Sequence, residues 1–142
     1  MTDKIIRVGI GVICINDKKQ FLFGKRKNAH GEGTWAPPGG HLEYNESFED
    51  GAKREVLEET GLMLRRFKIL TVANHLFPVE GKHYVTINCI GLVDGDPVIK
   101  EPDKIECWSF YDSWNDLPQP QFVPMDKDVP YKSIKAYISE NF

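Results

Sequence analysis

Short runs of apolar residues, separated by polar and glycine-rich segments, predict a chain built mainly from strands. Val8–Ile15 and Phe21–Phe23 flank the polar segment Asn16-Asp17-Lys18-Lys19, which is the pattern of a β-hairpin. Residues 28–34, rich in Gly, Asn and His, predict a loop, and Pro37-Pro38-Gly39-Gly40 predicts a turn. Further strands are expected at Leu64–Leu76, His83–Val93 and Ile105–Tyr111.

A helical period replaces the strand pattern in one segment near the middle of the chain. Phe48, Ala52 and Val56 recur along a single stripe and predict a helix over Phe48–Thr60, with that stripe buried and the neighbouring face open. A serine, residue 47, stands where an N-cap belongs, and Gly61 stands where a left-handed C-cap belongs.

A second helix is expected over Asp128–Ser139. Together the elements predict an α/β fold, in which a mixed sheet carries a helix on each side. The chain has no repeat, low-complexity tract or internal linker, so we expect residues 1–142 to form a single domain.

Composition narrows the class of partner. The net charge of −3 argues against a nucleic-acid polymer as the main partner, because such binders carry a basic excess, but a small anionic substrate is compatible with it. The sequence has neither an apolar run near the ~20 residues that cross a bilayer nor a signal-peptide pattern. Cys14, Cys89 and Cys107 show no metal-ligand spacing and are expected to be buried thiols. We therefore expect a cytoplasmic protein that does not bind membranes.

The predicted helix gathers carboxylates. Glu55, Glu58 and Glu59 fall at i, i+3 and i+4, so their side chains leave one face. Like charges at this spacing each cost an isolated helix roughly 0.2–0.5 kcal/mol. Such a face either solvates a surface or holds a cation, and oxygen donors suit a hard ion such as Mg²⁺ or Mn²⁺.

The spacing around these carboxylates resembles the signature of the Nudix hydrolases. The matching positions are Gly40, Glu46, Arg54, Glu55, Val56, Glu58, Glu59, Gly61 and Leu62. Flanking segments are similar to the MutT-type nucleotide triphosphate diphosphatases within that family: Gly24-Lys25-Arg26, residues 35–43, His83-Tyr84-Val85-Thr86 and Glu101-Pro102-Asp103-Lys104. The similarity runs from Arg7 to about Phe122. It implies the Nudix α/β/α sandwich with a central mixed sheet.

The resemblance also implies roles in catalysis. Glu58 and Glu59 are expected to bind the metal ion, with Glu55 acting as a ligand or as a base through a bound water. The backbone carbonyl of Gly40 is expected to complete the metal site, and Arg54 to orient a carboxylate. Metal ions neutralise phosphate charge and lower the pKa of bound water, which are the two requirements of this hydrolysis.

A further acidic residue is expected from a late loop. Glu101, Asp103 and Glu106 are the candidates, and we favour Glu106 as a catalytic group. A merely polar loop is the alternative interpretation.

Substrate contacts are predicted at five positions. Lys25 and Arg26, at a strand end, and His41, after the glycine pair, are expected to reach phosphate; a solvated strand end and a structural histidine are the alternatives. Asn74 and Thr86 are expected to bind a base edge. Several aromatic residues are candidates to stack on the base: Trp35, Phe77, Tyr84, Trp114 and Phe122.

The sequence therefore predicts a Mg²⁺- or Mn²⁺-dependent Nudix hydrolase that cleaves a nucleoside triphosphate, including oxidised or modified ones, to the monophosphate and pyrophosphate. Nucleotide sugars, dinucleoside polyphosphates and prenyl diphosphates are alternative substrates, and a nucleotide-sensing Nudix module without turnover is the alternative function. The preferred base, the number of metal ions and the oligomeric state, including a homodimer, stay open.

Overall fold

A computed structural model describes residues 4–27 and 30–142, so the first two residues of the predicted 28–34 loop lie outside the described residues. Within them, seven strands form one sheet. The elements in chain order are β1 (Ile6–Ile15), β2 (Phe21–Arg26), β3 (Trp35–Ala36), β4 (Gly39–His41), α1 (Phe48–Thr60), β5 (Arg65–Phe77), β6 (Lys82–Leu92), β7 (Ile105–Tyr111), the 3-10 helix η1 (Trp114–Asp116), α2 (Met125–Asp128) and α3 (Tyr131–Asn141).

The sheet is mixed, with the order β3-β2-β1-β6-β5. β1 runs parallel to β6, from Ile6 opposite His83 to Ile15 opposite Leu92, whereas the other pairings are antiparallel. β1 meets β2 at Ile15, opposite Phe21, and it pairs with β4 nearer its N-terminal end, over residues 9–11. β7 pairs with the other side of β2.

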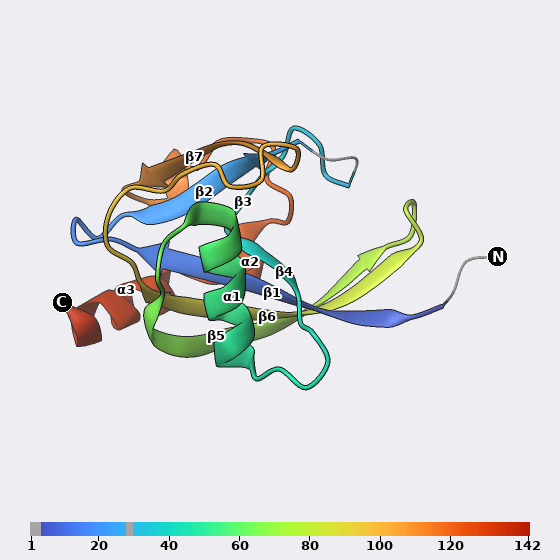
Figure 1. The fold of residues 1–142 in the computed structure, drawn as a ribbon, viewed down its shortest axis with the longest axis horizontal. Helices are drawn as coiled ribbons and strands as arrows, with labels where there is room; N and C mark the ends of the chain where they lie inside the picture. Colours follow the sequence, from blue (N-terminus) through green and yellow to red (C-terminus); the bar gives the residue numbers. More distant parts are fainter. Residues whose placement is uncertain (1–3, 28–29) are drawn as a thin grey trace.

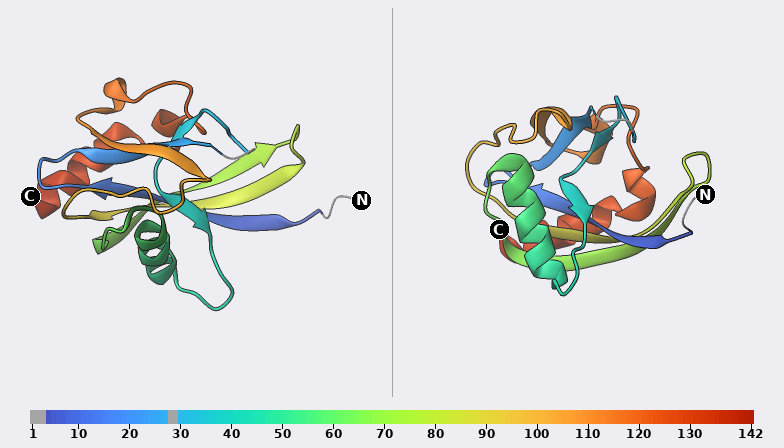
Figure 2. Two further views of the ribbon diagram at one scale, coloured as in Figure 1. Left: turned by 45° about the horizontal axis from the view of Figure 1, so that its top comes forward. Right: turned by 45° about the vertical axis from the view of Figure 1, so that its right-hand side comes forward.

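Helices α1 and α3 lie on opposite sides of this sheet (Figures 1 and 2). The alternation of side chains along β1 divides the core accordingly. Val12 belongs to a cluster with Ala52 and Val56 of α1, whereas Ile13 belongs to a cluster with Ile134 of α3. The expected α/β/α arrangement with a central mixed sheet is confirmed.

The caps of α1 follow the sequence signals. The Ser47 side chain accepts a hydrogen bond from the backbone N–H of Asp50 (3.1 Å), and Gly61 adopts the left-handed conformation with φ of 75°. The buried stripe is shorter than predicted, because Phe48 is 38% exposed and Ala52 is the first buried residue of the three in the stripe. Phe48 lies in the first turn, at the rim of the contact with the sheet.

Two predicted elements need correction. Gly39 and Gly40 do not form a turn after the prolines: they begin β4 and pair with Gly11 and Ile10. The last helix does not begin at Asp128, which instead ends α2; α3 starts at Tyr131, after Pro130. Proline lacks an N–H and disfavours helical geometry in the residue before it, so the two helices stay separate.

The three cysteines are free thiols, but Cys107 is only half-buried, against expectation. Burial raises the pKa of Cys89 to about 12. None of the helices in the described residues is long and apolar enough to span a bilayer.

Candidate functional site

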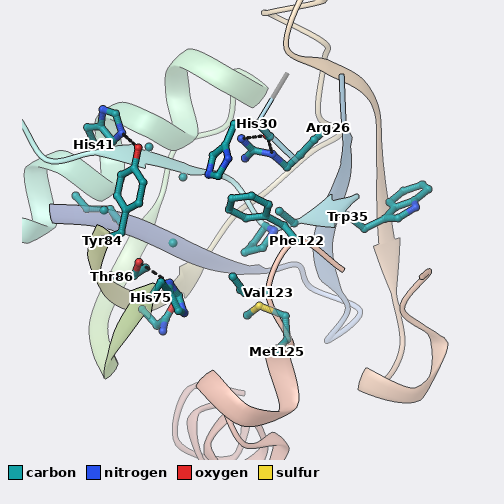
Figure 3. A pocket seen from close by; sticks show the side chains of 18 of the residues that line it. Arg26, His30, Trp35, His41, His75, Tyr84, Thr86, Phe122, Val123 and Met125 are labelled. Carbon is teal, nitrogen blue, oxygen red and sulfur yellow. Dashed lines mark hydrogen bonds between the residues drawn. The ribbon is translucent and has the colours of Figure 1, made fainter. Parts of the chain in front are cut away.

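A cavity of about 160 Å³ lies between the sheet, α1 and the segment that leads into α2 (Figure 3). It arises from a change of residue size along β1. Ile13 packs into the core beside α3, but Gly11 and Gly9, on the same face, leave space. A Cβ atom at Gly11 would lie 3.1 Å from Oδ1 of Asn88, and one at Gly9 would lie 3.4 Å from Oγ1 of Thr86. The two glycines therefore keep the space beside these polar atoms open.

The three carboxylates of α1 occupy different environments. Glu59 lines the cavity, and its Oε2 accepts a hydrogen bond from the N–H of Gly39 (3.0 Å). Glu55 is 8% exposed, and a Cβ at Gly40 would collide with its carboxylate. The Glu58 side chain is 51% exposed. The helix face thus turns the buried Glu55 and the partly buried Glu59 toward β4 and leaves Glu58 in contact with solvent.

Burial shapes the electrostatics of this pair. It raises the pKa of Glu59 to about 8, against the lowering effect of the Gly39 N–H, and the charges of Glu55 and Glu101 raise this pKa further. Burial also raises the pKa of Glu55, which the hydrogen bond from Arg54 opposes. A cation placed here would favour both ionised carboxylates.

Arg54 links α1 to the loop before it. Its Nε and Nη2 donate to the two carboxylate oxygens of Glu46 (2.6 and 2.9 Å), and Nη1 donates to Glu55 (2.8 Å). Nη2 also donates to the backbone carbonyl of His41 (2.9 Å), and Nη1 also donates to the carboxylate of Glu58 (3.3 Å). Arg54 therefore contacts Glu46, Glu55 and Glu58, a position compatible with the predicted orienting role.

The donor set fits a hard divalent cation. Glu55, Glu58 and Glu59 supply carboxylate oxygens, and Gly40 leaves no side chain between the β4 backbone and Glu55. Across residues 4–27 and 30–142, no three His, Cys, Asp or Glu side chains converge into a complete metal cage. Mg²⁺ is compatible with this arrangement, because it typically binds through one or two carboxylates, keeps waters and shares substrate phosphates.

The late acidic loop is split between two locations. Glu106 forms an ion pair with Lys25 (3.5 Å), and neither side chain is among the residues that line the cavity. Glu101, by contrast, lies close enough to act electrostatically on both Glu55 and Glu59. Of the three candidates, Glu101 is therefore the one whose charge acts on both carboxylates, although it also forms an ion pair with Lys104 (3.4 Å).

Arg26 and His41 both line the cavity. Nε and Nη2 of Arg26 donate to the carbonyl of His30 (3.0 and 2.9 Å), and its guanidinium lies 4.1 Å over the Phe122 ring. Nε2 of His41 lies 3.0 Å from the hydroxyl of Tyr84. Burial, followed by the charges of neighbouring basic residues, lowers the pKa of His41, so its neutral form is favoured.

The two residues predicted to bind a base edge separate in the structure. Thr86 lines the cavity, with its Oγ1 3.0 Å from Nδ1 of His75. Asn74 is absent from the lining, and its Oδ1 is hydrogen-bonded to Nε2 of His83.

Aromatic rings enclose the part of the cavity away from α1. Phe77 and Phe122 stack with centroids 5.7 Å apart, and the Tyr84 centroid lies 6.2 Å from that of Phe77. Figure 3 shows the rings of His30, Tyr84 and Phe122 around the cavity. His30 packs edge-to-face on both phenylalanines, and neither of its ring nitrogens has a hydrogen-bond partner among the described residues. Buried polar atoms are nearly always paired, so a polar ligand in this cavity would meet a ready partner. Trp114, another stacking candidate, is instead buried in the core.

Sequence reasoning missed four polar residues of this region: His30, His75, Asn88 and Asp128. A usable signal exists for Asn88. It alternates with Thr86 on β6, on the face that continues as Ile90, so a row of core residues changes to polar at this point. His75 and Asp128 meet only through the fold, and no spacing in the sequence indicates their contact.

Comparisons with known proteins agree on one family. The protein-family model described as "NUDIX domain" matches residues 5–133 of the chain. The chain is 30% identical to the "RNA pyrophosphohydrolase" of Pasteurella multocida (strain Pm70), over 96% of this chain and 75% of that protein. It is 35% identical to the "8-oxo-dGTP diphosphatase" of Proteus vulgaris, over 55% of this chain and 70% of that protein. The crystal structure of a MutT NUDIX hydrolase from Burkholderia pseudomallei superposes with a TM-score of 0.78 at 31% identity, covering 92% of this chain and 97% of that one.

Proposed function

Since the chain belongs to the NUDIX domain family, we propose that it hydrolyses a nucleoside triphosphate to the monophosphate and pyrophosphate. The matched relatives are named as a pyrophosphohydrolase and a diphosphatase, enzymes that act on phosphate anhydrides. One observation carries the proposal. The Glu59 carboxylate lines a cavity whose far part is lined by aromatic rings, and the buried Glu55 carboxylate lies next to it against Gly40. Charged phosphates and a flat base require these two environments side by side.

A divalent cation, Mg²⁺ or Mn²⁺, is the proposed cofactor. Glu55, Glu58, Glu59 and the Gly40 carbonyl would hold it, and it would supply charge neutralisation and a water of lowered pKa. Arg54 keeps the carboxylates in place through its bonds to Glu55 and Glu58. Glu101 is the proposed additional acidic group, with Glu106 as the alternative.

The cavity suits the base end of the substrate. Its volume of about 160 Å³ is below the ~300 Å³ at which pockets for whole drug-sized ligands begin, so it suits one ring system rather than a complete nucleotide. The phosphates would then extend toward α1, past Arg26 and His41. Both side chains line that route and carry N–H groups that suit phosphate oxygens.

A second substrate has specific support. The relative named RNA pyrophosphohydrolase aligns with 96% of the chain. The 5′-triphosphate end of an RNA would undergo the same bond cleavage, with the remainder of the RNA outside the cavity. If it proves to be the substrate, the expectation that no nucleic-acid polymer binds is wrong.

The test is a substrate screen of the purified protein with Mg²⁺. It compares normal and oxidised nucleoside triphosphates, a 5′-triphosphorylated RNA oligonucleotide, nucleotide sugars, dinucleoside polyphosphates and prenyl diphosphates, and it measures orthophosphate and pyrophosphate separately. We expect pyrophosphate from a triphosphate, and in ¹⁸O-labelled water the heavy oxygen should enter the monophosphate. Orthophosphate as the sole first product would overturn the assignment, and tight nucleotide binding without turnover would favour a sensor.

A further inference from the structure

A buried hydrogen-bonded chain reaches the inner wall of the cavity from α2. Nε2 of His75 lies 2.5 Å from a carboxylate oxygen of Asp128, and Nδ1 of the same ring lies 3.0 Å from Oγ1 of Thr86. The His75 and Asp128 side chains are only 14% and 8% exposed. Figure 3 shows His75 and Thr86 together below the aromatic rings. Of the three, Thr86 and His75 line the cavity directly.

The hydrogen bonds from Asp128 through His75 fix the direction in which the hydroxyl proton of Thr86 points. An ionised carboxylate only accepts hydrogen bonds, so Asp128 requires the proton of His75 on Nε2. In the neutral ring Nδ1 is then bare and accepts the hydroxyl proton of Thr86. The hydroxyl proton is thereby used, and Thr86 presents lone pairs, as an acceptor, to the cavity.

A second series of hydrogen bonds, which starts from the backbone carbonyl of Asp128, orients Asn88. Nδ2 of Asn88 donates to Oγ1 of Thr71 (3.1 Å), and this hydroxyl donates to the backbone carbonyl of Asp128 (2.8 Å). The amide oxygen of Asn88 is therefore the atom that faces Gly11 and the cavity. Thr86 and Asn88 lie two residues apart on β6, so both acceptors leave the same face of the strand.

We propose that Asp128, acting through His75 and Thr71, fixes Thr86 and Asn88 as two acceptors, and that the cavity thereby selects a base whose edge carries N–H donors. The inference rests on the proposed function and specifies which base edge the site accepts. A ring N–H beside an amino group satisfies both acceptors. An amino group beside a bare ring nitrogen satisfies only one, and it sets a lone pair against the other.

The mismatch has a predictable size. Leaving a buried acceptor without a donor lowers binding by roughly tenfold to a hundredfold. Nucleoside triphosphates whose bases differ only in this hydrogen-bonding edge therefore measure the loss of binding that an unpaired acceptor causes. We expect kcat/KM to fall in the order dGTP, dITP, dATP, because the edge carries a ring N–H with an amino group, then a ring N–H alone, then an amino group beside a bare nitrogen.

The substitution Asp128→Asn tests which groups donate and which accept in the hydrogen bonds from residue 128 through His75 to Thr86. The new amide donates to Nε2 of His75, which moves the ring proton to Nδ1, and Nδ1 then donates to Thr86. The hydroxyl proton of Thr86 is released toward the cavity, so one acceptor becomes a donor. We expect the ratio of kcat/KM for dGTP over dATP to fall at least tenfold.

Asp126→Asn is the matched control, because it removes the same charge from the same short helix at an exposed position outside the cavity lining. It should leave the ratio unchanged. Thr86→Val provides a second test that does not alter α2, and it should reduce the ratio by removing the acceptor. If Asp128→Asn and Thr86→Val both leave the ratio within twofold of wild type, the proposal is wrong.

Two measurements separate this inference from the proposed function. Calorimetric binding of dGMP and dAMP needs no turnover, so a preference for dGMP that Asp128→Asn removes would support the inference even if no triphosphate is hydrolysed. Nitrogen-15 NMR of the His75 ring reports its protonation directly. We expect a protonated Nε2 and a bare Nδ1 in the wild type at pH 7.5 and the opposite tautomer in Asp128→Asn; a doubly protonated wild-type ring would overturn the assignment.

Discussion

At the scale of single residues, burial rather than helical spacing distinguishes the three carboxylates of α1. Spacing places Glu55, Glu58 and Glu59 on one face, and the sequence predicts no more than that. The structure buries Glu55 and lines the cavity with Glu59, whereas Glu58 stays in solvent. The difference depends on β4, which covers one side of the helix face and which the sequence does not predict as a strand.

The first prediction concerns activity. Glu59→Gln keeps the shape of the side chain but removes a charged cation ligand, so we expect a loss of roughly 10²–10⁴ in kcat, at about 1.4 kcal/mol per factor of ten. Pyrophosphate release measures it. Glu49→Gln, on the exposed side of the same helix, is the control and should retain activity. A loss below threefold for Glu59→Gln would show that this carboxylate does not hold the ion.

The second prediction follows from the raised pKa of Glu59, about 8 against the usual 4.5. Between these values the folded protein binds more protons than the unfolded chain, so its stability declines as pH rises. Without metal, we expect the melting temperature to fall between pH 6 and pH 9. Glu59→Gln should make this decline shallower, and Glu49→Gln should not. An equal decline in wild type and Glu59→Gln would contradict the assignment.

At the scale of elements, local signals predicted helix α1 well because its ends are set by neighbouring residues. Ser47 and Gly61 cap it as expected, and β7 also has the predicted bounds. β4 was missed because three residues rich in glycine carry no strand pattern. They form a strand only because β1 pairs with β2 at Ile15 alone, so that the backbone of residues 9–11 of β1 is free to pair with β4 on that edge. Tertiary context, which no local pattern contains, decides such short elements.

The third prediction tests the C-cap of α1. Gly61 has φ of 75°, and a Cβ there would lie 3.1 Å from a methyl group of Val98. Gly61→Ala should therefore lower the free energy of unfolding by more than the roughly 1–2 kcal/mol that a left-handed conformation alone costs a residue with a Cβ. Urea denaturation at constant pH measures this loss.

Gly95→Ala is the control for this measurement. Gly95 has φ of 91° but no atom within 4 Å of its would-be Cβ among the described residues, so it reports the backbone cost alone. A smaller loss for Gly61→Ala than for Gly95→Ala would show that the contact with Val98 relaxes without cost.

At the scale of the whole molecule, the sandwich was predictable and the cavity was not. Strand and helix periods, together with the family signature, predicted a mixed sheet between helices. The cavity instead combines residues of all seven strands, of α1 and of the segment before α2, and its inner wall depends on a contact between His75 and Asp128. Contacts across such distances in the chain leave no trace in residue spacing, which is why Thr86 was predicted without the residues that orient it.

The fourth prediction concerns metal removal. A chelator should abolish turnover, and Mg²⁺ or Mn²⁺ should restore it, because the donors are oxygens without a thiolate or histidine set. Independently of activity, Mg²⁺ should raise the melting temperature, since a ligand of the folded state stabilises it. This rise should grow from pH 6 to pH 9 as Glu59 loses its proton, and it should shrink in Glu59→Gln. Full activity in excess chelator would exclude the metal-dependent mechanism.

The parallel pairing of β1 with β6 bears on the order in which the molecule assembles. Ile6 finds its partner in His83, so most of the chain must be synthesised before the first strand is covered on that side. Pairings between distant segments form slowly, because the entropy of closing the intervening loop is lost before contacts compensate for it. Asp128 lies later still, so a nascent chain would pair β1 with β6 before Asp128, which orients the His75 ring, has been synthesised. During synthesis, the ability to discriminate between bases would therefore be acquired after the sheet itself.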